Sequence, residues 1–246
     1  MKTLGIDIGG SGIKAAPVDL RTGRLTAERA RLETPEKPKP VVVARAVAEL
    51  VAKFNWSGHV GVGFPGVVCD GRTMTAANLH PDWVGLDAGR LFTRATRCPV
   101  TMINDADAAG LAEMRFGAGK REPGTVLLVT LGTGVGSALF RGGRLLPNTE
   151  LGHLPWRGGK SAEKFVSAAA RKRRDLSWEE WAGRVTEYLH TLESLLWPDL
   201  IIVGGGVSAK YRKWLRFVRL RTKIVPARLF NEAGIVGAAL AAARKH

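Results

Sequence analysis

Cysteine is one of the scarcest residues in this chain. Only two, Cys69 and Cys98, occur among 246 residues, and they do not form a Cys-x-x-Cys pair. A disulfide framework needs several cysteines at regular spacings. The two thiols are therefore expected to stay reduced, which favours a cytoplasmic protein.

Long apolar runs are also missing. No uninterrupted apolar stretch of about 18 residues, the length of a membrane span, occurs in the sequence. The first residues, MKTLGIDIG, lack the apolar segment and the small-residue cleavage site of a signal peptide. We therefore expect no export and no membrane partner.

Acidic residues are few relative to basic ones. The chain has 22 Asp and Glu against 37 Lys and Arg, a formal net charge of +15. The segment 204–231 has no acidic residue but eight basic ones: Lys210, Arg212, Lys213, Arg216, Arg219, Arg221, Lys223 and Arg228. A surface of this kind attracts polyanions such as nucleic acid, anionic lipid or a phosphate polymer. The alternative is an ordinary solvated basic surface.

Two common nucleotide-binding signatures are absent. No G-x-x-x-x-G-K-[ST] sequence occurs, which excludes a P-loop enzyme. GVGFPG, at 61–66, has G-x-G-x-x-G spacing, but no helix is predicted after it and Pro65 precedes its last glycine. A dinucleotide fingerprint needs a helix at that point, so we do not assign one.

Three glycine-rich turns follow apolar, strand-like runs. They are GIDIGGSGIK (5–14), LGTGVGSAL (131–139) and GGG (204–206). Glycine lets backbone N–H groups approach a ligand closely, and oriented N–H groups bind anions without any charged side chain. Each turn alone could be a plain hairpin turn. Together they predict a site that holds several phosphates.

The order of predicted elements indicates an α/β fold built from two similar halves. In the first half we expect strands at 2–9, 13–20, 22–34, 59–66 and 99–105, with helices at 41–54, 87–96 and 106–117. In the second we expect three strands within 125–146, another at 198–206, and helices at 161–174, 177–197 and 232–245. Two such halves would direct their glycine turns toward one another across a cleft.

Six motifs in this order resemble the ROK family of sugar kinases. They are DIGGSGIK, Pro65-Gly66, NDADAAGLAE, LGTGVGSAL, ELGH and IIVGGGVS. The segments NTELGHLPWRGGKSAEKF and LSWEEWAGRV look most similar to the polyphosphate glucokinase branch. The resemblance implies two actin-like (ribonuclease H-like) α/β domains facing across a cleft. They would cover 1–105, completed by the helix 232–246, and 106–231.

The resemblance also implies a reaction, the phosphorylation of the 6-hydroxyl of glucose. A hydroxyl must lose its proton as it attacks phosphorus, and a carboxylate can accept that proton. Asp105 lies at a predicted strand end, before a helix whose dipole would favour its charge. Asp105 is thus expected to be the general base. Its alternative role is a helix N-cap, but Asp107 fits that role better or could bind a metal through water.

The implied glucose contacts are Gly66, Asn78, Asn104, Asp105, Glu150, His153 and Glu163. The implied donor contacts are Asp7, Gly9, Gly10, Ser11, Gly12, Lys14, Gly132, Thr133, Gly134, Gly205, Gly206 and Lys210. Asp7 would hold Mg²⁺, directly or through water.

The chain departs from most of the family in one respect. Most members carry a cysteine-rich zinc loop soon after the ELGH histidine, but here no cysteine follows Cys98. We therefore expect Mg²⁺ and no zinc. Because of the basic segment, we expect polyphosphate to be a donor, together with ATP. The alternatives are an ATP-only glucokinase and a glucomannokinase.

A DNA-binding regulator is a further alternative, because the family includes repressors. Those carry a helix-turn-helix before the first glycine motif, which here begins at Gly5. We therefore expect no nucleic-acid partner. The expected partners are glucose, polyphosphate and ATP, and the resemblance implies a homodimer.

Overall fold

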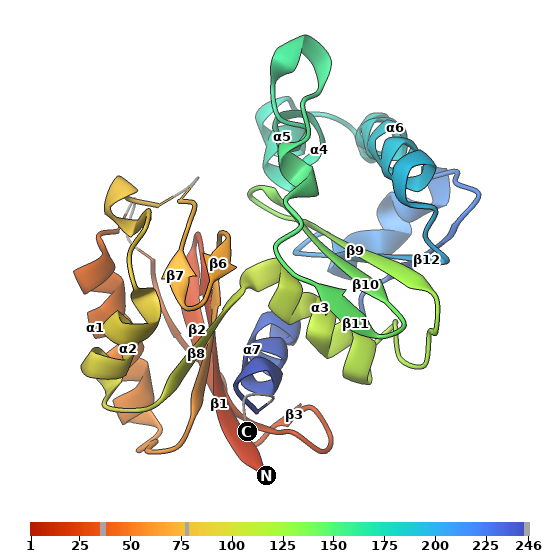
Figure 1. The fold of residues 1–246 in the computed structure, drawn as a ribbon. Helices are drawn as coiled ribbons and strands as arrows, with labels where there is room; N and C mark the ends of the chain where they lie inside the picture. Colours follow the sequence, from red (N-terminus) through yellow and green to blue (C-terminus); the bar gives the residue numbers. More distant parts are fainter. Residues whose placement is uncertain (35–37, 77–78, 244–246) are drawn as a thin grey trace. The chain divides into compact units, whose positions relative to one another are not determined.

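A computed structural model describes residues 1–34, 38–76 and 79–243 of the chain (Figure 1). The chain divides into two compact units. Met1–Ala112 and Glu232–His246 form the first unit, and Glu113–Asn231 forms the second. Helix α3 (Asp105–Phe116) begins in the first unit and ends in the second.

The first unit is built on a six-stranded sheet. Its strands are β1 (Lys2–Gly9), β2 (Gly12–Asp19), β3 (Arg24–Leu25), β4 (Ala30–Leu32), β5 (Val60–Phe64) and β8 (Val100–Asn104). They follow the order β3-β2-β1-β5-β8, and β4 also pairs with β2. The β1–β2 pair is antiparallel, whereas β1, β5 and β8 run parallel. A short hairpin, β6 (Val68–Cys69) and β7 (Arg72–Thr73), follows β5.

Helices cover both faces of this sheet. Helices α1 (Pro40–Lys53) and α2 (Ala88–Thr96) lie on one face, and α7 (Ala233–Ala243) lies on the other (Figure 1). Glycines allow α7 to pack directly on the strands: any side chain at Gly5 or Gly61 would collide with the carbonyl oxygen of Ile235 or Ala238. The end of the chain is therefore a structural part of the first unit.

The second unit has a five-stranded sheet in the order β11-β10-β9-β12-β13. These strands are β9 (Thr125–Leu131), β10 (Val135–Arg141), β11 (Arg144–Leu146), β12 (Leu200–Gly204) and β13 (Lys223–Pro226). The first three form an antiparallel meander, and β9, β12 and β13 run parallel.

Helix α6 (Trp178–Leu196) supplies much of the core of this unit. A capping box between Ser177 and Glu180 starts the helix. Its buried face, including Trp181 and Leu189, packs in one cluster with sheet residues such as Val129. Two short helices, α4 (Glu163–Val166) and α5 (Ala168–Arg173), precede it.

Short 3₁₀ helices complete both units. They are η1 (Pro81–Trp83), η2 (Leu151–His153), η3 (Arg157–Gly159), η4 (Ser208–Lys213), η5 (Leu215–Phe217) and η6 (Phe230–Glu232). No helix in the described part of the chain is both long and apolar enough to cross a bilayer.

The elements differ from the sequence expectations in several places, one of which is the unexpected strand β13. The strand expected at 22–34 is split into β3 and β4, which pair with different parts of β2. The helix expected at 161–174 is interrupted because Ser167 is extended and caps α5 through a hydrogen bond from the Ala170 N–H. The expectation that Asp107 caps α3 is wrong, because its N–H donates to Oδ1 of Asn104 (3.0 Å).

Candidate functional site

The first glycine turn joins β1 to β2 and is held by two side chains from further along the chain. The Arg31 guanidinium donates to the carbonyl of Ser11 (2.7 Å), and the Thr34 hydroxyl donates to the carbonyl of Gly9 (2.7 Å). A Cβ at Gly10 would meet nothing within 4 Å, so the turn has open space beside it. Arg31 and Thr34 were not anticipated, and they make this turn a fixed element with a cation at its edge.

Asp7 lies beside this turn, opposite Lys14 on the neighbouring strand. The Lys14 ammonium is 3.4 Å from Oδ2 of Asp7, and both side chains are mostly buried. Gly234, in the first turn of α7, lies against the carboxylate, since a Cβ there would be 2.8 Å from Cγ of Asp7. The carboxylate of Asp7 therefore lies at the N-terminal end of α7.

Asp105 is the first residue of α3, directly after β8. Its Oδ1 accepts a hydrogen bond from the N–H of Ala106 (2.7 Å). Gly63 of β5 lies close by, with its missing Cβ 3.7 Å from the Asp105 Cα. The backbone around Asp105 is thus fixed by a strand end, a helix start and a neighbouring strand.

Asn104 connects Asp105 to Gly66. Its amide nitrogen donates to the Gly66 carbonyl (3.1 Å) while its amide oxygen caps α3, and the side chain is buried. Of the expected glucose residues, the first unit thus brings Gly66, Asn104 and Asp105 together. Asn78 lies outside the described residues.

The second glycine turn, between β9 and β10, is closed by the Gly132 N–H, which donates to the Gly134 carbonyl (3.0 Å). The Gly132 carbonyl accepts from the N–H of Ala169 (3.1 Å), which ties the turn to α5. The side chain of Thr133 is exposed at its tip.

Glu150, His153 and Glu163 gather beside this turn. Nε2 of His153 is 3.9 Å from Oε2 of Glu150, and a Cβ at Gly134 would lie 2.6 Å from Oε2 of Glu163. Burial raises the pKa of Glu150; the neighbouring His153 lowers this pKa, and the charge of Glu163 raises it. Two interacting carboxylates and an imidazole form a polar cluster that can accept and donate hydrogen bonds to the hydroxyls of a sugar.

Ser137 of β10, which the sequence analysis missed, holds the segment that carries Glu150. Its hydroxyl accepts from the N–H of Leu151 (3.1 Å) and donates to the carbonyl of Thr149. The residue is 2% exposed. Ser137 therefore orients Glu150 without being a ligand contact itself.

The third glycine turn follows β12 and packs against the end of β9. Gly205 has a φ of +78°, and a Cβ there would be 2.5 Å from the carbonyl oxygen of Leu131. Ser208 donates its hydroxyl to the Gly205 carbonyl (2.7 Å). The turns at 132–134 and 204–206 therefore lie close together in the second unit, and Lys210 is exposed in η4 just after them.

No group of three or more His, Cys, Asp or Glu side chains that could hold a metal occurs within 1–34, 38–76 and 79–243. Of the two cysteines, Cys69 is exposed and Cys98 is buried, and both are free. Asp7 is the carboxylate that lies beside the first glycine turn.

Comparison with known proteins places these features in a family. The ROK family matches residues 3–164. The chain is 50% identical over 238 residues to a polyphosphate glucokinase of Mycobacterium tuberculosis (strain CDC 1551 / Oshkosh), covering 96% of this chain and 89% of that protein.

Two solved structures are similar over nearly their whole length. One is an inorganic polyphosphate/ATP-glucomannokinase from Arthrobacter sp. strain KM, with a TM-score of 0.97, 49% identity, and coverage of 100% of this chain and 99% of that one. The other is a ROK family glucokinase from Streptomyces griseus in complex with glucose and AMPPNP, with a TM-score of 0.86, 27% identity, and coverage of 99% and 100%. These similarities confirm the predicted two-domain actin-like fold, and the chain belongs to the ROK family.

Proposed function

We propose that this protein is a polyphosphate glucokinase, which transfers a phosphoryl group from inorganic polyphosphate to the 6-hydroxyl of glucose. The observation that carries this function is the 50% identity to a polyphosphate glucokinase over 96% of the chain. ATP is the second donor, in line with the polyphosphate/ATP-glucomannokinase that shares 49% identity.

Asp105 is the general base of this reaction. The oxygen of the 6-hydroxyl forms a bond to the terminal phosphorus as the bond to the next bridging oxygen breaks. The hydroxyl proton passes to the Asp105 carboxylate and then to solvent, and the donor leaves one phosphate shorter. The support for this role is the position of Asp105 at the start of α3, where its Oδ1 accepts a hydrogen bond from the Ala106 N–H.

Glucose is held by Glu150, His153 and Glu163 in the second unit and by Gly66, Asn78, Asn104 and Asp105 in the first. The support for the residues of the second unit is that they lie together beside the 132–134 turn. Glu150 is close enough to His153 and Glu163 for its pKa to respond to both. Ser137 is a positioning residue for this group.

The donor phosphates lie on the glycine turns. The residues proposed to contact the donor are Asp7, Gly9, Gly10, Ser11, Gly12 and Lys14 in the first unit, and Gly132, Thr133, Gly134, Gly205, Gly206 and Lys210 in the second. Their support is the approach of two turns in the second unit and the cations Lys14 and Arg31 at the turn of the first.

Asp7 is the residue that would hold Mg²⁺. Mg²⁺ is commonly bound by one or two carboxylates with substrate phosphates and waters, so a single carboxylate beside a phosphate turn fits this metal better than an all-protein cage would. When bound, the ion would neutralise part of the charge on the donor phosphates. Zinc is not part of this proposal.

Two further features stay proposals. The protein works as a homodimer, and it resides in the cytoplasm, which the two free thiols support.

A donor test decides the function. Purified protein with Mg²⁺ is given glucose or mannose and, in turn, long-chain polyphosphate, tripolyphosphate or ATP, and sugar 6-phosphate is measured. We expect turnover of glucose with polyphosphate at least as fast as with ATP. Turnover with ATP and none with any polyphosphate would instead establish an ATP-only glucokinase, and the rate with mannose decides whether the enzyme is a glucomannokinase.

A further inference from the structure

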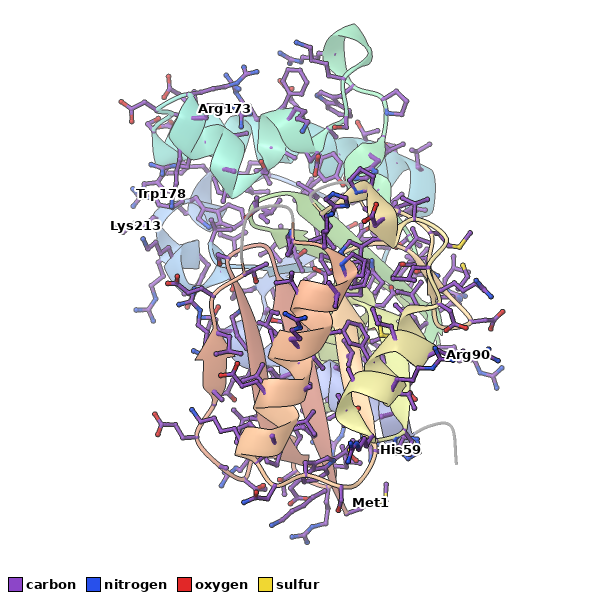
Figure 2. The ribbon with its side chains drawn as sticks, turned by 90° about the vertical axis from the view of Figure 1, so that its left-hand side faces the viewer. Met1, His59, Arg90, Arg173, Trp178 and Lys213 are labelled. Carbon is purple, nitrogen blue, oxygen red and sulfur yellow. The ribbon has the colours of Figure 1, made fainter. Side chains whose placement is uncertain are left out.

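A surface hollow lies where the start of α6 meets η4 and η5. Its volume is about 380 Å³, and its lining is Trp178 and Glu179 from α6 with Arg212, Lys213, Arg216 and Phe217 from the two 3₁₀ turns. Figure 2 labels Trp178 and Lys213, which come from segments 35 residues apart in the chain, on the same edge of the view. We call this feature the Trp178 hollow.

The hollow lies against a packed aromatic cluster. The rings of Trp178 and Trp181 have centroids 5.9 Å apart, and those of Trp181 and Trp214 are 5.0 Å apart. Trp181 and Trp214 are fully buried, and their indole N–H groups donate to the carbonyls of Val166 and Val207. The side chains that line the hollow therefore stand on a packed aromatic core.

The charge of the hollow is strongly positive. Arg212, Lys213 and Arg216 are all exposed, with Glu179 as the one carboxylate of the lining. The structure pairs none of these three cations with an acid among the residues it describes, although other arginines and lysines form ion pairs. Three cations held next to one another without counterions repel one another, and a bound polyanion would relieve that repulsion.

A second basic segment meets the hollow at Trp178. Helix α5 ends in the basic sequence RKRR at 171–174, and the Arg171 guanidinium lies over the Trp178 ring, 3.8 Å from its centroid. Arg173 of the same segment is labelled above Trp178 in Figure 2. Through Arg171, the RKRR segment thus lies next to the basic lining of the hollow.

Stacked arginines decide which polyanion fits. Both rings that line the hollow have a guanidinium over them, Arg171 over Trp178 and Arg216 over Phe217 (4.7 Å). A guanidinium lying on a ring keeps its N–H donors at its edge, where they can bind phosphate oxygens. A nucleobase would have to displace these guanidinium groups to stack, whereas a phosphate chain has no base and only accepts hydrogen bonds.

We propose that the Trp178 hollow is an anchoring site for inorganic polyphosphate. The hollow binds a part of the polyphosphate that lies away from the phosphate being transferred. This inference rests on the proposed function and extends it. The segment from the 204–206 turn runs directly into η4 and η5, so a donor bound at that turn could continue along Lys210 to the hollow. Only a donor longer than a few phosphates would gain from such a site.

The test compares long and short donors in a charge-neutralised variant. The variant carries R212Q, K213Q and R216Q, and the matched control carries R45Q, K53Q and R94Q, three exposed basic residues on helices α1 and α2. Both lose three positive charges. We expect the KM for long-chain polyphosphate to rise about tenfold or more in the hollow variant alone. The slope of a plot of log KM against the logarithm of the salt concentration should fall by about 2, which is the loss expected for three phosphate contacts. The KM for tripolyphosphate should change less than about twofold.

Two results would overturn the anchoring site. An equal rise in KM for tripolyphosphate and long-chain polyphosphate would place the three cations at the transfer site instead. Equal behaviour of the variant and the control would show that the cations only solvate the surface.

A binding measurement keeps this inference separate from the proposed function. Equilibrium binding of labelled long-chain polyphosphate is measured with the wild type and both variants, with no turnover required. Weaker binding by the hollow variant alone supports the anchor even if the wild type shows no polyphosphate-dependent kinase activity. Unchanged binding of polyphosphate by the hollow variant contradicts the anchoring site. Tighter binding of single-stranded DNA than of polyphosphate, through the same three cations, also contradicts it.

Discussion

Replacing Asp105 with Asn tests the chemical step with little effect on the fold. The amide oxygen of Asn can still accept the hydrogen bond that the Ala106 N–H donates to Oδ1. The loss of one charge from the first turn of α3 should cost about 0.3–1 kcal/mol of stability. For a chain of this size that corresponds to a fall in melting temperature of about 4 °C or less.

The effect on catalysis should be much larger. A positioned general base contributes about 10²- to 10⁴-fold, which is roughly 2.7–5.5 kcal/mol of barrier. The assay measures kcat with saturating glucose and polyphosphate, glucose binding by calorimetry, and thermal unfolding. We expect kcat to fall at least about 100-fold with glucose affinity nearly unchanged. A D105N protein that keeps wild-type kcat would refute the assignment.

A matched change at the preceding residue separates position from chemistry. Asn104→Ala removes the cap of α3 and the hydrogen bond to Gly66, so it should cost about 1 kcal/mol of stability or more. Its kcat should fall less than that of D105N, because the base is still present. A larger loss of kcat in N104A than in D105N would show that the helix start matters more than the carboxylate.

Four further outcomes follow from the site. Burial raises the pKa of Glu150 above its ordinary 4.5, so the native state resists ionisation of this group. The stability of the wild type should therefore fall relative to that of E150Q as pH rises above 4.5. Parallel curves of stability against pH for the two proteins would contradict this. His153→Ala should raise the KM for glucose by about 5- to 150-fold, the scale of about 1–3 kcal/mol, and an effect confined to the donor KM would count against the sugar contact. Arg31→Ala frees the Ser11 carbonyl and should raise the donor KM about threefold to tenfold with glucose KM unchanged, as steady-state kinetics can check. Metal analysis of purified protein should find no stoichiometric zinc, whereas activity should require added Mg²⁺.

The regular elements were the part of the fold that the sequence predicted best. Strands β1, β9 and β12 are compact apolar runs that end in a glycine or directly before one, and α6 has a long amphipathic pattern with a capping signal. The failures come from competition between local and non-local bonds. Ser167 interrupts an otherwise helical pattern because its side chain bonds to the backbone, and β13 was missed because its short, cationic run ending at Pro226 depends on pairing with β12.

The same distinction applies to the site. Asp7, Asp105, Glu150 and His153 could be singled out because each lies in a short motif at a strand end or turn. The supporting residues could not, since Arg31 and Thr34 reach the first glycine turn from 20 and 25 residues away, and Ser137 bonds to a residue 14 positions later. Such contacts depend on strand register and on the path of the loops, which no local pattern specifies.

The position of α7 has a consequence for biosynthesis. The first unit is built from segments at both ends of the chain, whereas the second, Glu113–Asn231, is continuous. During translation the sheet face that receives α7 through Gly5 and Gly61 stays uncovered until the ribosome has made everything up to Ala243. The second unit can therefore fold while the first is still incomplete. Nascent or C-terminally shortened chains should be the forms that chaperones and proteases recognise.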